Sequence, residues 1–189
     1  MRCHLCLSLS WHPLCPICLS TILTPTPSKR VLEDGLVVYS SYKYSEISNL
    51  LHTKHTYLGA KVFSQLSKNA ILPYIKTLTC QDIFSIPIDD HVRSGYSHSA
   101  IIAKALKDYI EPLYGSLRAK NKLRYSGQKL DVRKKEKRDF ILTCKENLDV
   151  VLIDDIVTTG NTLIEANEVC RKANVNVLFA LVLADAKER

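Results

Sequence analysis

The sequence predicts an α/β protein, in which helices flank a mostly parallel sheet and a small cysteine-bearing module precedes it. Apolar stretches of strand length alternate with stretches of helical periodicity along most of the chain. One of them, residues 150–153, is an unbroken apolar run, which is typical of a central strand buried on both faces. Four of the seven cysteines fall within the first 18 residues, in two CxxC pairs.

The composition is that of an ordinary soluble globular protein. Of the 189 residues, 46% are hydrophobic and 24% are charged. No apolar run approaches the roughly 20 residues of a membrane-spanning helix. The first residues include cysteine and histidine where a secretory signal would have its apolar core, so we expect a cytoplasmic protein. In that compartment, seven cysteines indicate metal binding or free thiols rather than disulfides.

Residues 1–24 are expected to form a separate zinc-binding module. Two CxxC pairs suit the tetrahedral coordination of a structural zinc ion, and so small a segment needs a metal or another staple to fold. The alternative is incidental cysteines or a disulfide pair. His4 and His12 are expected to be bystanders, because four thiolates complete the site. The predicted metal ligands are Cys3, Cys6, Cys15 and Cys18.

Residues 25–35 are expected to link this module to a domain that spans 36–189, because proline alternates with threonine at the start of the segment. Within the domain, the spacing of apolar residues predicts the elements. The first helix would carry Lys54 and His55 on its solvated side, and Asn174 can take a left-handed C-cap position. The predicted strands span 36–44, 83–88, 113–117, 150–153 and 175–184, and the predicted helices span 45–67, 100–110 and 162–173.

A ribose-phosphate pocket is predicted where the central strand ends. Asp154 and Asp155 follow it directly, at the edge where open α/β sheets bind ligands, and can accept hydrogen bonds from two vicinal ribose hydroxyls. The next turn offers backbone N–H groups at a helix N-terminus, which suit a 5′-phosphate, and it has no lysine, so it is not a Walker A loop. The alternative is an ordinary strand–helix junction whose polar residues cap the helix. The turn residues are Thr158, Thr159, Gly160, Asn161 and Thr162.

The net charge of +7 is concentrated in one basic segment. Residues 118–138 hold ten lysines or arginines and two acidic residues, a net of +8, so the rest of the chain sums to −1. Such a segment is too polar to bury and would attract a polyanion, and the alternative is a solvated loop. The candidate binding residues are Arg118, Lys120, Lys122, Arg124, Tyr125, Lys129, Arg133, Lys134, Lys135, Lys137 and Arg138.

The stretch from Asp154 to Thr162 closely resembles the phosphoribosyl diphosphate (PRPP) motif of type I phosphoribosyltransferases, an acidic pair and a short spacer before Thr-Thr-Gly-x-Thr. The chain as a whole resembles the ComF family of bacterial competence proteins, which join a four-cysteine zinc module to a phosphoribosyltransferase domain. The resemblance is also carried by Tyr42-Lys43-Tyr44, the helix through Lys54 and Gly59, Ile86-Pro87-Ile88, and Gln128, Leu130, Arg133 and Phe140.

The match is incomplete at residues 93–98, which stand where the family usually reads Arg-Gly-Phe-Asn-Gln. Gly95 and an aromatic residue, Tyr96, are kept, whereas Ser94, Ser97 and His98 replace an arginine, an asparagine and a glutamine. The second proline of the family's Pro-Val-Pro strand end is also absent. The contacts that these family residues make are therefore not expected to carry over unchanged.

The resemblance implies a competence protein that binds single-stranded DNA and PRPP, the latter with Mg²⁺, during DNA uptake in natural transformation. PRPP would occupy the acid pair and the turn, and single-stranded DNA would occupy the basic segment, where Tyr125 could stack on bases. A DNA-import helicase or an inner-membrane channel is implied as a partner. The implied location is the cytoplasm, peripheral to the inner membrane.

The alternative is an active phosphoribosyltransferase that acts on a base or a nucleic-acid-linked acceptor. The acid pair would orient the ribose, and the basic segment would close over the site and exclude water. No residue can be named as catalytic, and no segment clearly forms a base-recognition pocket, which favours binding over turnover. The pyrophosphate group would lie at the loop after the strand at 83–88, whose candidate residues are Asp89, Asp90, His91 and Arg93.

Overall fold

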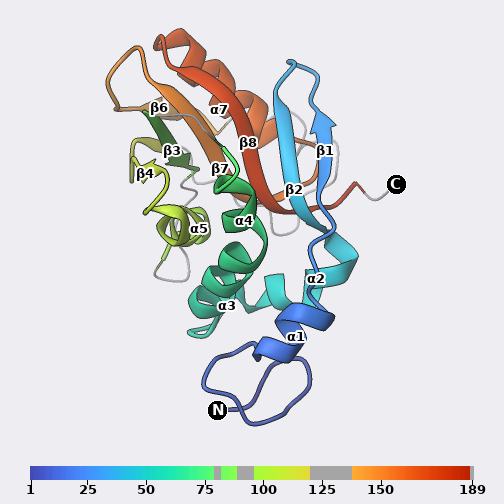
Figure 1. The fold of residues 1–189 in the computed structure, drawn as a ribbon. Coiled ribbons are helices and arrows are strands. Elements are labelled where there is room, and N and C mark those ends of the chain that lie inside the picture. Colours follow the sequence, from blue (N-terminus) through green and yellow to red (C-terminus); the bar gives the residue numbers. More distant parts are fainter. Residues whose placement is uncertain (79–81, 89–95, 120–137, 188–189) are drawn as a thin grey trace.

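The computed structural model describes residues 1–78, 82–88, 96–119 and 138–187 (Figure 1). Its main feature is a six-stranded sheet in the order β1-β2-β8-β7-β3-β4, in which only the pairing of β1 with β2 is antiparallel. A second sheet pairs β5 with β6. The predicted α/β class, with a mostly parallel sheet and a cysteine cluster at the N-terminus, is therefore confirmed.

The secondary structure alternates between strands and helices, as predicted. The strands are β1 Ser28–Val31, β2 Val37–Lys43, β3 Ile83–Pro87, β4 Glu111–Pro112, β5 Leu117–Ala119, β6 Phe140–Leu142, β7 Asp149–Val157 and β8 Asn176–Asp185. The helices are α1 Pro16–Thr21, α2 Tyr44–Leu51, the 3₁₀ turn η1 His52–His55, α3 Gly59–Leu66, the π-helical η2 Ser67–Ile71, α4 Leu72–Ile75, α5 His98–Leu106 and α7 Asn161–Lys172. In the described ranges, none of the helices is long and apolar enough to cross a membrane.

Strand β7 is the centre of the sheet, with β3 on one side and β8 on the other. Its residues 150–153 are fully buried because helices cover both faces of the sheet (Figure 1). Val151 and Ile153 pack in a core with residues of α3 and α5, whereas Val150 and Leu152 pack in a second core with residues of α7. An unbroken apolar run thus fills two cores from one strand, as the sequence predicts.

Strand β1 lies within the segment that was expected to be a linker. It pairs with β2 as a hairpin, with Lys29 opposite Tyr39, and Gly35 takes a positive φ of 88° in the turn between them. The strand is short and mostly exposed at the edge of the sheet, so it lacks the apolar pattern that reveals a buried strand. The hairpin turn is also joined to α7, because the Asn167 side chain donates to Asp34 Oδ2 at 2.8 Å.

The single helix expected at 45–67 is interrupted. Helix α2 ends at Leu51, the 3₁₀ turn η1 follows, and α3 begins at Gly59. Gly59 permits a close approach there, because an added Cβ would lie 2.2 Å from the carbonyl oxygen of Thr53. The break redirects the chain and, as described below, brings Lys54 to the acid pair instead of to solvent.

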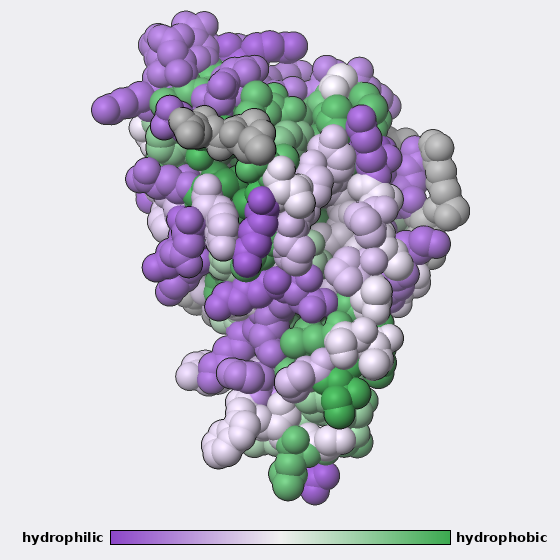
Figure 2. Space-filling model, viewed as in Figure 1, coloured by the Kyte–Doolittle hydropathy of each residue, from purple (hydrophilic) through white to green (hydrophobic). Residues whose placement is uncertain are grey.

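The N-terminal module is docked on the helices of the larger domain. Leu14 and Leu23 are buried in the same core as α2 and α3. The Gln65 side chain accepts from the backbone N–H of Leu14 at 3.0 Å and donates to its carbonyl oxygen at 2.9 Å. Apolar side chains also remain exposed on the module, where Figure 2 shows green atoms at the lower tip of the molecule, and they include Leu7, Leu9, Trp11, Ile17 and Ile22.

Candidate functional site

The acid pair lies at the carboxyl edge of the sheet, although inside β7 and not after it. The pairing of β3 with β7 ends where Pro87 faces Ile153, whereas β8 continues to pair with β7 as far as Val157. Strand β7 is therefore longer than the sequence predicts, because its polar end is still bonded to β8. On the β3 side, Asp154 and Asp155 extend past the last paired residue. Open α/β sheets bind their ligands at this carboxyl edge.

The two carboxylates are half-buried and have different surroundings. Asp154 Oδ1 accepts a hydrogen bond from the backbone N–H of Asp155 at 2.8 Å. Asp155 Oδ2 lies 3.3 Å from Lys54 Nζ and forms an ion pair with it. Two adjacent carboxylates of this kind have lone pairs available for hydroxyl donors.

The turn after β7 presents polar groups to solvent at the start of a 12-residue helix. Thr158, Thr159 and Asn161 are exposed, and Thr162 is half-buried. Gly160 caps α7 with a φ of 90°, a left-handed conformation that favours glycine. The first N–H groups of a helix have no partner within it, so this turn can donate several hydrogen bonds to an anion. The residues named for the predicted phosphate turn thus lie together at the start of α7, and their role in phosphate binding stays a prediction.

Arg30 of β1 holds this turn in place. Its Nη2 donates to the carbonyl oxygen of Thr158 at 2.9 Å, and its Nη1 donates to Asp185 Oδ1 at 3.0 Å. Leu32, at the end of the same strand, packs directly on Gly160, where an added Cβ would lie 2.6 Å from the leucine Cδ2. The edge hairpin therefore contacts the phosphate turn at its first residue and at its middle residue.

A second group of residues absent from the sequence prediction surrounds Lys54. The carbonyl oxygen of Lys54 accepts from Tyr96 Oη at 2.9 Å and from His98 Nε2 at 2.9 Å. A carbonyl only accepts, so His98 carries a proton on Nε2. In the comparison with the ComF pattern, Tyr96 keeps the family's aromatic residue whereas His98 replaces a glutamine, and neither position was predicted to belong to the site.

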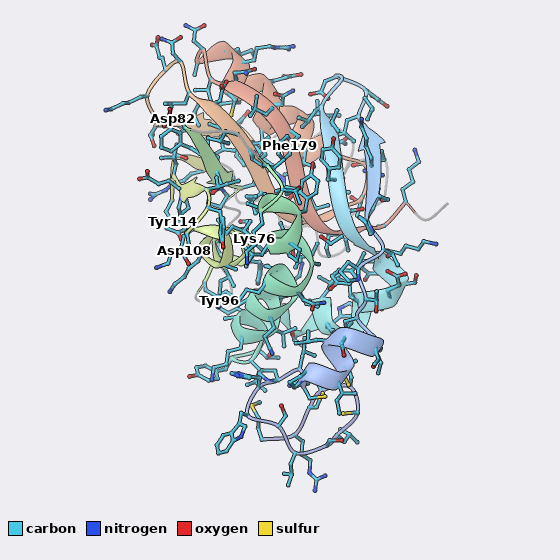
Figure 3. All side chains as sticks on the ribbon, viewed as in Figure 1. Lys76, Asp82, Tyr96, Asp108, Tyr114 and Phe179 are labelled. Atoms are coloured by element: carbon cyan, nitrogen blue, oxygen red, sulfur yellow. The ribbon has the colours of Figure 1, made fainter. Side chains whose placement is uncertain are left out.

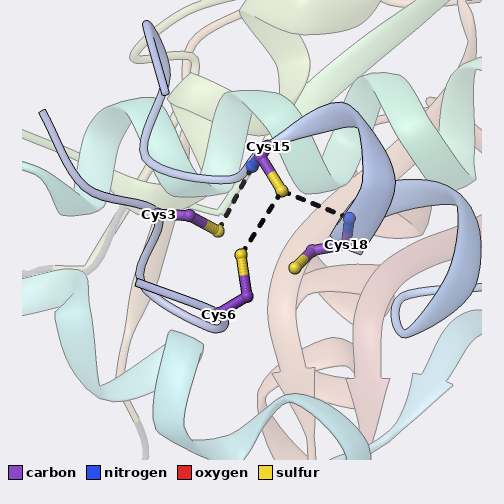
Figure 4. A group of neighbouring side chains, drawn as sticks. All are labelled: Cys3, Cys6, Cys15 and Cys18. Carbon is purple, nitrogen blue, oxygen red and sulfur yellow. Dashed lines mark hydrogen bonds between the residues drawn. The ribbon is translucent and has the colours of Figure 1, made fainter. Parts of the chain in front are cut away.

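The four cysteines predicted as metal ligands form one cluster (Figure 4). Their sulfur atoms all lie within 4.8 Å of one another, and Cys6 Sγ lies 3.7 Å from Cys15 Sγ. A tetrahedral zinc ion with Zn–S bonds of about 2.3 Å would hold its sulfurs roughly 3.8 Å apart. The thiol set therefore fits zinc, and no disulfide joins these cysteines. His4 and His12 are exposed and lie outside the cluster, as expected.

The cluster also separates the acidities of its thiols. Burial opposes ionisation of Cys3, yet backbone N–H groups nearby, including that of Cys15 at 3.3 Å, lower its pKa to about 6. Burial and the neighbouring thiols raise the pKa of Cys18 to about 12. A metal ion would reverse the second effect, because its positive charge favours the thiolate.

Several predicted site residues lie outside the described ranges. They include the whole candidate pyrophosphate loop, Asp89, Asp90, His91 and Arg93, and all candidates of the basic segment between Lys120 and Lys137. The two described ends of that segment are close together, because Arg118 faces Ile141 and Ala119 faces Phe140 across the β5–β6 pair. The backbone N–H of Arg138 donates to Glu165 Oε2 at 3.0 Å, which joins this end to α7, the helix of the phosphate turn.

Comparison with known proteins gives structural similarity only. The sequence matches no protein-family model and no curated protein. In structure, the chain is similar to a hypoxanthine phosphoribosyltransferase from Staphylococcus aureus (18% identity, 65% of this chain, 62% of that one, TM-score 0.41). It is also similar to a Leishmania donovani UMP synthase (18% identity, 89% of this chain, 30% of that one, TM-score 0.41). A third similar structure is an adenine phosphoribosyltransferase from Thermoanaerobacter pseudethanolicus (16% identity, 88% of this chain, 87% of that one, TM-score 0.44).

The chain spans less than two thirds of the first two of these proteins. All three TM-scores are below 0.5, so the interpretation of the site depends on its own geometry. That geometry combines a half-buried acid pair, a turn rich in N–H donors and a lysine on Asp155. It can hold a ligand that carries both hydroxyls and an anionic group.

Proposed function

We propose that this chain is a ComF-type competence protein that binds PRPP, with Mg²⁺, and single-stranded DNA during DNA uptake. The observation that carries the proposal is the direct continuity of the acid pair on β7 with the phosphate turn that opens α7. Carboxylates suit ribose hydroxyls, and backbone N–H groups suit a phosphate. A ribose 5-phosphate carries both kinds of group on one small molecule.

In this proposal, Asp154 and Asp155 accept hydrogen bonds from the 2- and 3-hydroxyls of the ribose. The turn at 158–162 donates to the 5′-phosphate, and Arg30 keeps the carbonyl of Thr158 directed away from that anion by bonding to it at 2.9 Å. The diphosphate on C1 would then extend toward the loop after β3. Asp89, Asp90, His91 and Arg93 stay the proposed residues of that loop.

Mg²⁺ fits this arrangement as a ligand of PRPP and not as a resident of a protein cage. The acid pair offers hard oxygen ligands, but in the described residues the cysteine cluster is the only group of three or more metal-binding side chains. Mg²⁺ commonly binds one or two carboxylates together with substrate phosphates. When bound, it would neutralise charge on the diphosphate.

The proposal assigns single-stranded DNA to the basic segment. Residues 118–138 carry a net charge of +8, and exposed Arg118 stands where the segment leaves β5. Cations that neutralise DNA phosphates release counterions, which favours binding. We further propose the division into a zinc module at 1–24, a connecting segment at 25–35 and a phosphoribosyltransferase-like domain at 36–189. The proposed location is the cytoplasm, peripheral to the inner membrane, beside a DNA-import helicase or channel.

Calorimetric titration with Mg²⁺-PRPP tests the ribose-phosphate site. The double variant Asp154→Asn with Asp155→Asn is expected to weaken binding at least about tenfold, because hydrogen bonds to charged groups contribute about 1.5–3 kcal/mol each. Asp149→Asn is the matched control. It removes one carboxylate charge from the opposite end of β7, where the Asp149 side chain accepts a hydrogen bond from the Asn176 side chain at 2.7 Å. Equal affinities in all three proteins would refute the site.

A pyrophosphate assay on the same samples separates binding from catalysis. Wild-type protein is expected to bind PRPP without releasing pyrophosphate, with or without single-stranded DNA. Release that depends on DNA or on an added base would instead identify a phosphoribosyltransferase, the alternative that the sequence leaves open. The acid-pair variant would then lose turnover as well as binding.

A further inference from the structure

Lys54 is placed at the acid pair by a dedicated set of contacts. Its Nζ lies 3.3 Å from Asp155 Oδ2, although the two residues are 101 positions apart in the sequence. The ion pair is largely shielded, since the side chains of Lys54 and Asp155 are 30% and 15% exposed. A lysine this close to the ribose-binding carboxylate must affect what the site can hold.

The backbone of Lys54 is fixed by two rings that come from the start of α5. Tyr96 Oη lies 2.9 Å from the carbonyl oxygen of Lys54 and 3.2 Å from that of Thr56. His98 Nε2 lies 2.9 Å from the carbonyl oxygen of Lys54. Figure 3 labels Tyr96 beside the lower helices of the domain. The two rings also pack on each other, with centroids 5.2 Å apart. The η1 turn that carries Lys54 is therefore held before any ligand arrives.

Gly59 shows how closely this turn is packed. An added Cβ would lie 2.4 Å from Tyr96 Oη and 2.2 Å from the carbonyl oxygen of Thr53. The tyrosine hydroxyl thus packs against Gly59, at the break between α2 and α3 that sequence periodicity did not predict. The contacts hold the lysine backbone and leave its long side chain to reach the carboxylate.

The chemistry of a ribose ligand gives this ammonium group a specific neighbour. Carboxylates that bind the 2- and 3-hydroxyls lie next to C1, which is bonded to the carbon of the 2-hydroxyl. We propose that Lys54 is a specificity-determining residue, which recognises an anionic group on C1 and so selects PRPP over ribose 5-phosphate. This inference rests on the proposed function, because it assumes that the acid pair binds the ribose.

In the free protein, Lys54 and Asp155 compensate each other's charge. At C1, ribose 5-phosphate offers the lysine only an uncharged hydroxyl oxygen in exchange for the carboxylate. The diphosphate of PRPP offers charged oxygen acceptors, and charge-assisted hydrogen bonds are the strong ones. The lysine therefore contributes more binding free energy when the ligand carries the C1 anion.

The test compares Mg²⁺-PRPP with ribose 5-phosphate by calorimetry on wild-type protein and on Lys54→Met, which keeps the side-chain length without the charge. Lys54→Met is expected to weaken PRPP binding at least about tenfold, the size of one lost charge-assisted hydrogen bond, and to change ribose 5-phosphate binding by less than about threefold. Lys54→Arg, which keeps the positive charge, should retain most of the preference for PRPP over ribose 5-phosphate. Lys61→Met, an exposed position on α3, is the matched control.

Each outcome decides the question. Equal losses for both ligands would show that Lys54 merely orients Asp155, and unchanged PRPP affinity would show that it has no role. Either result overturns the inference while leaving the ribose-phosphate site standing. Wild-type protein that binds neither ligand would overturn the proposed function itself. Tyr96→Phe, which removes only the hydroxyl, should lower the preference for PRPP in the same direction and by less.

Discussion

Gly160→Ala should destabilise the protein through two separable effects. Gly160 has a φ of 90°, and an alanine in the left-handed region costs about 1–2 kcal/mol. Its new Cβ would also lie 2.6 Å from Cδ2 of buried Leu32, and forcing a methyl group into a packed site typically costs about 1–3 kcal/mol. We therefore expect the free energy of unfolding to fall by about 2–5 kcal/mol. PRPP binding should weaken as well, because the phosphate turn must shift.

Gly35→Ala supplies the matched control, and urea unfolding supplies the measurement. Gly35 has nearly the same φ, 88°, but nothing lies within 4 Å of its added Cβ, so only the backbone cost of about 1–2 kcal/mol applies. The difference between the two variants isolates the contact with Leu32. Equal losses at both glycines would show that Leu32 does not constrain the turn. Losses below about 0.5 kcal/mol at both positions would refute the backbone argument.

Two further predictions concern the module and the basic segment. Zinc binding should release about one proton or more per ion at neutral pH, because Cys18, whose pKa is raised to about 12, is protonated before the metal binds. Zinc affinity should therefore rise with pH. A titration in the presence of a pH indicator that shows no proton release would contradict this prediction. Neutralising Lys134, Lys135, Lys137 and Arg138 together should weaken single-stranded DNA binding and flatten its log–log salt dependence by about 0.7 per lost contact, measured by fluorescence anisotropy. Lys107→Ala, at an exposed lysine outside this segment, is the control and should keep the wild-type slope. An unchanged slope in the quadruple variant would place the DNA elsewhere.

The features that the sequence predicts well are those that depend on neighbouring residues. The buried strand, the acid pair and the phosphate turn are contiguous, so their chemistry is readable from one stretch of the chain. The cysteine cluster is also close in sequence, because its four cysteines lie within 16 positions. So short a stretch leaves few ways to arrange the four sulfur atoms other than together. Asn174 also takes the left-handed conformation expected of a residue at a helix C-terminus, with a φ of 53°.

The residues that sequence reasoning missed reach the site through the topology of the sheet. Lys54 meets Asp155 across 101 positions, and Arg30 meets Thr158 across 128. Periodicity placed Lys54 on a solvated helix face because it did not reveal the break before Gly59. Strand β1 was hidden for a different reason, since a short exposed edge strand carries no apolar alternation. No local pattern encodes such contacts, which form only when the folded chain brings Arg30 and Lys54 to residues near the carboxyl end of β7.

The β5–β6 pair has a consequence for how this protein can vary. Because Ala119 faces Phe140, the residues between them begin and end at neighbouring positions of one strand pair. A change in their number therefore need not displace β7 or α7, and doubling the length of a flexible loop costs only about 0.6 kcal/mol of closure entropy. The stretch that holds the net positive charge can thus lengthen, shorten or change its charge between relatives while the phosphate turn stays the same.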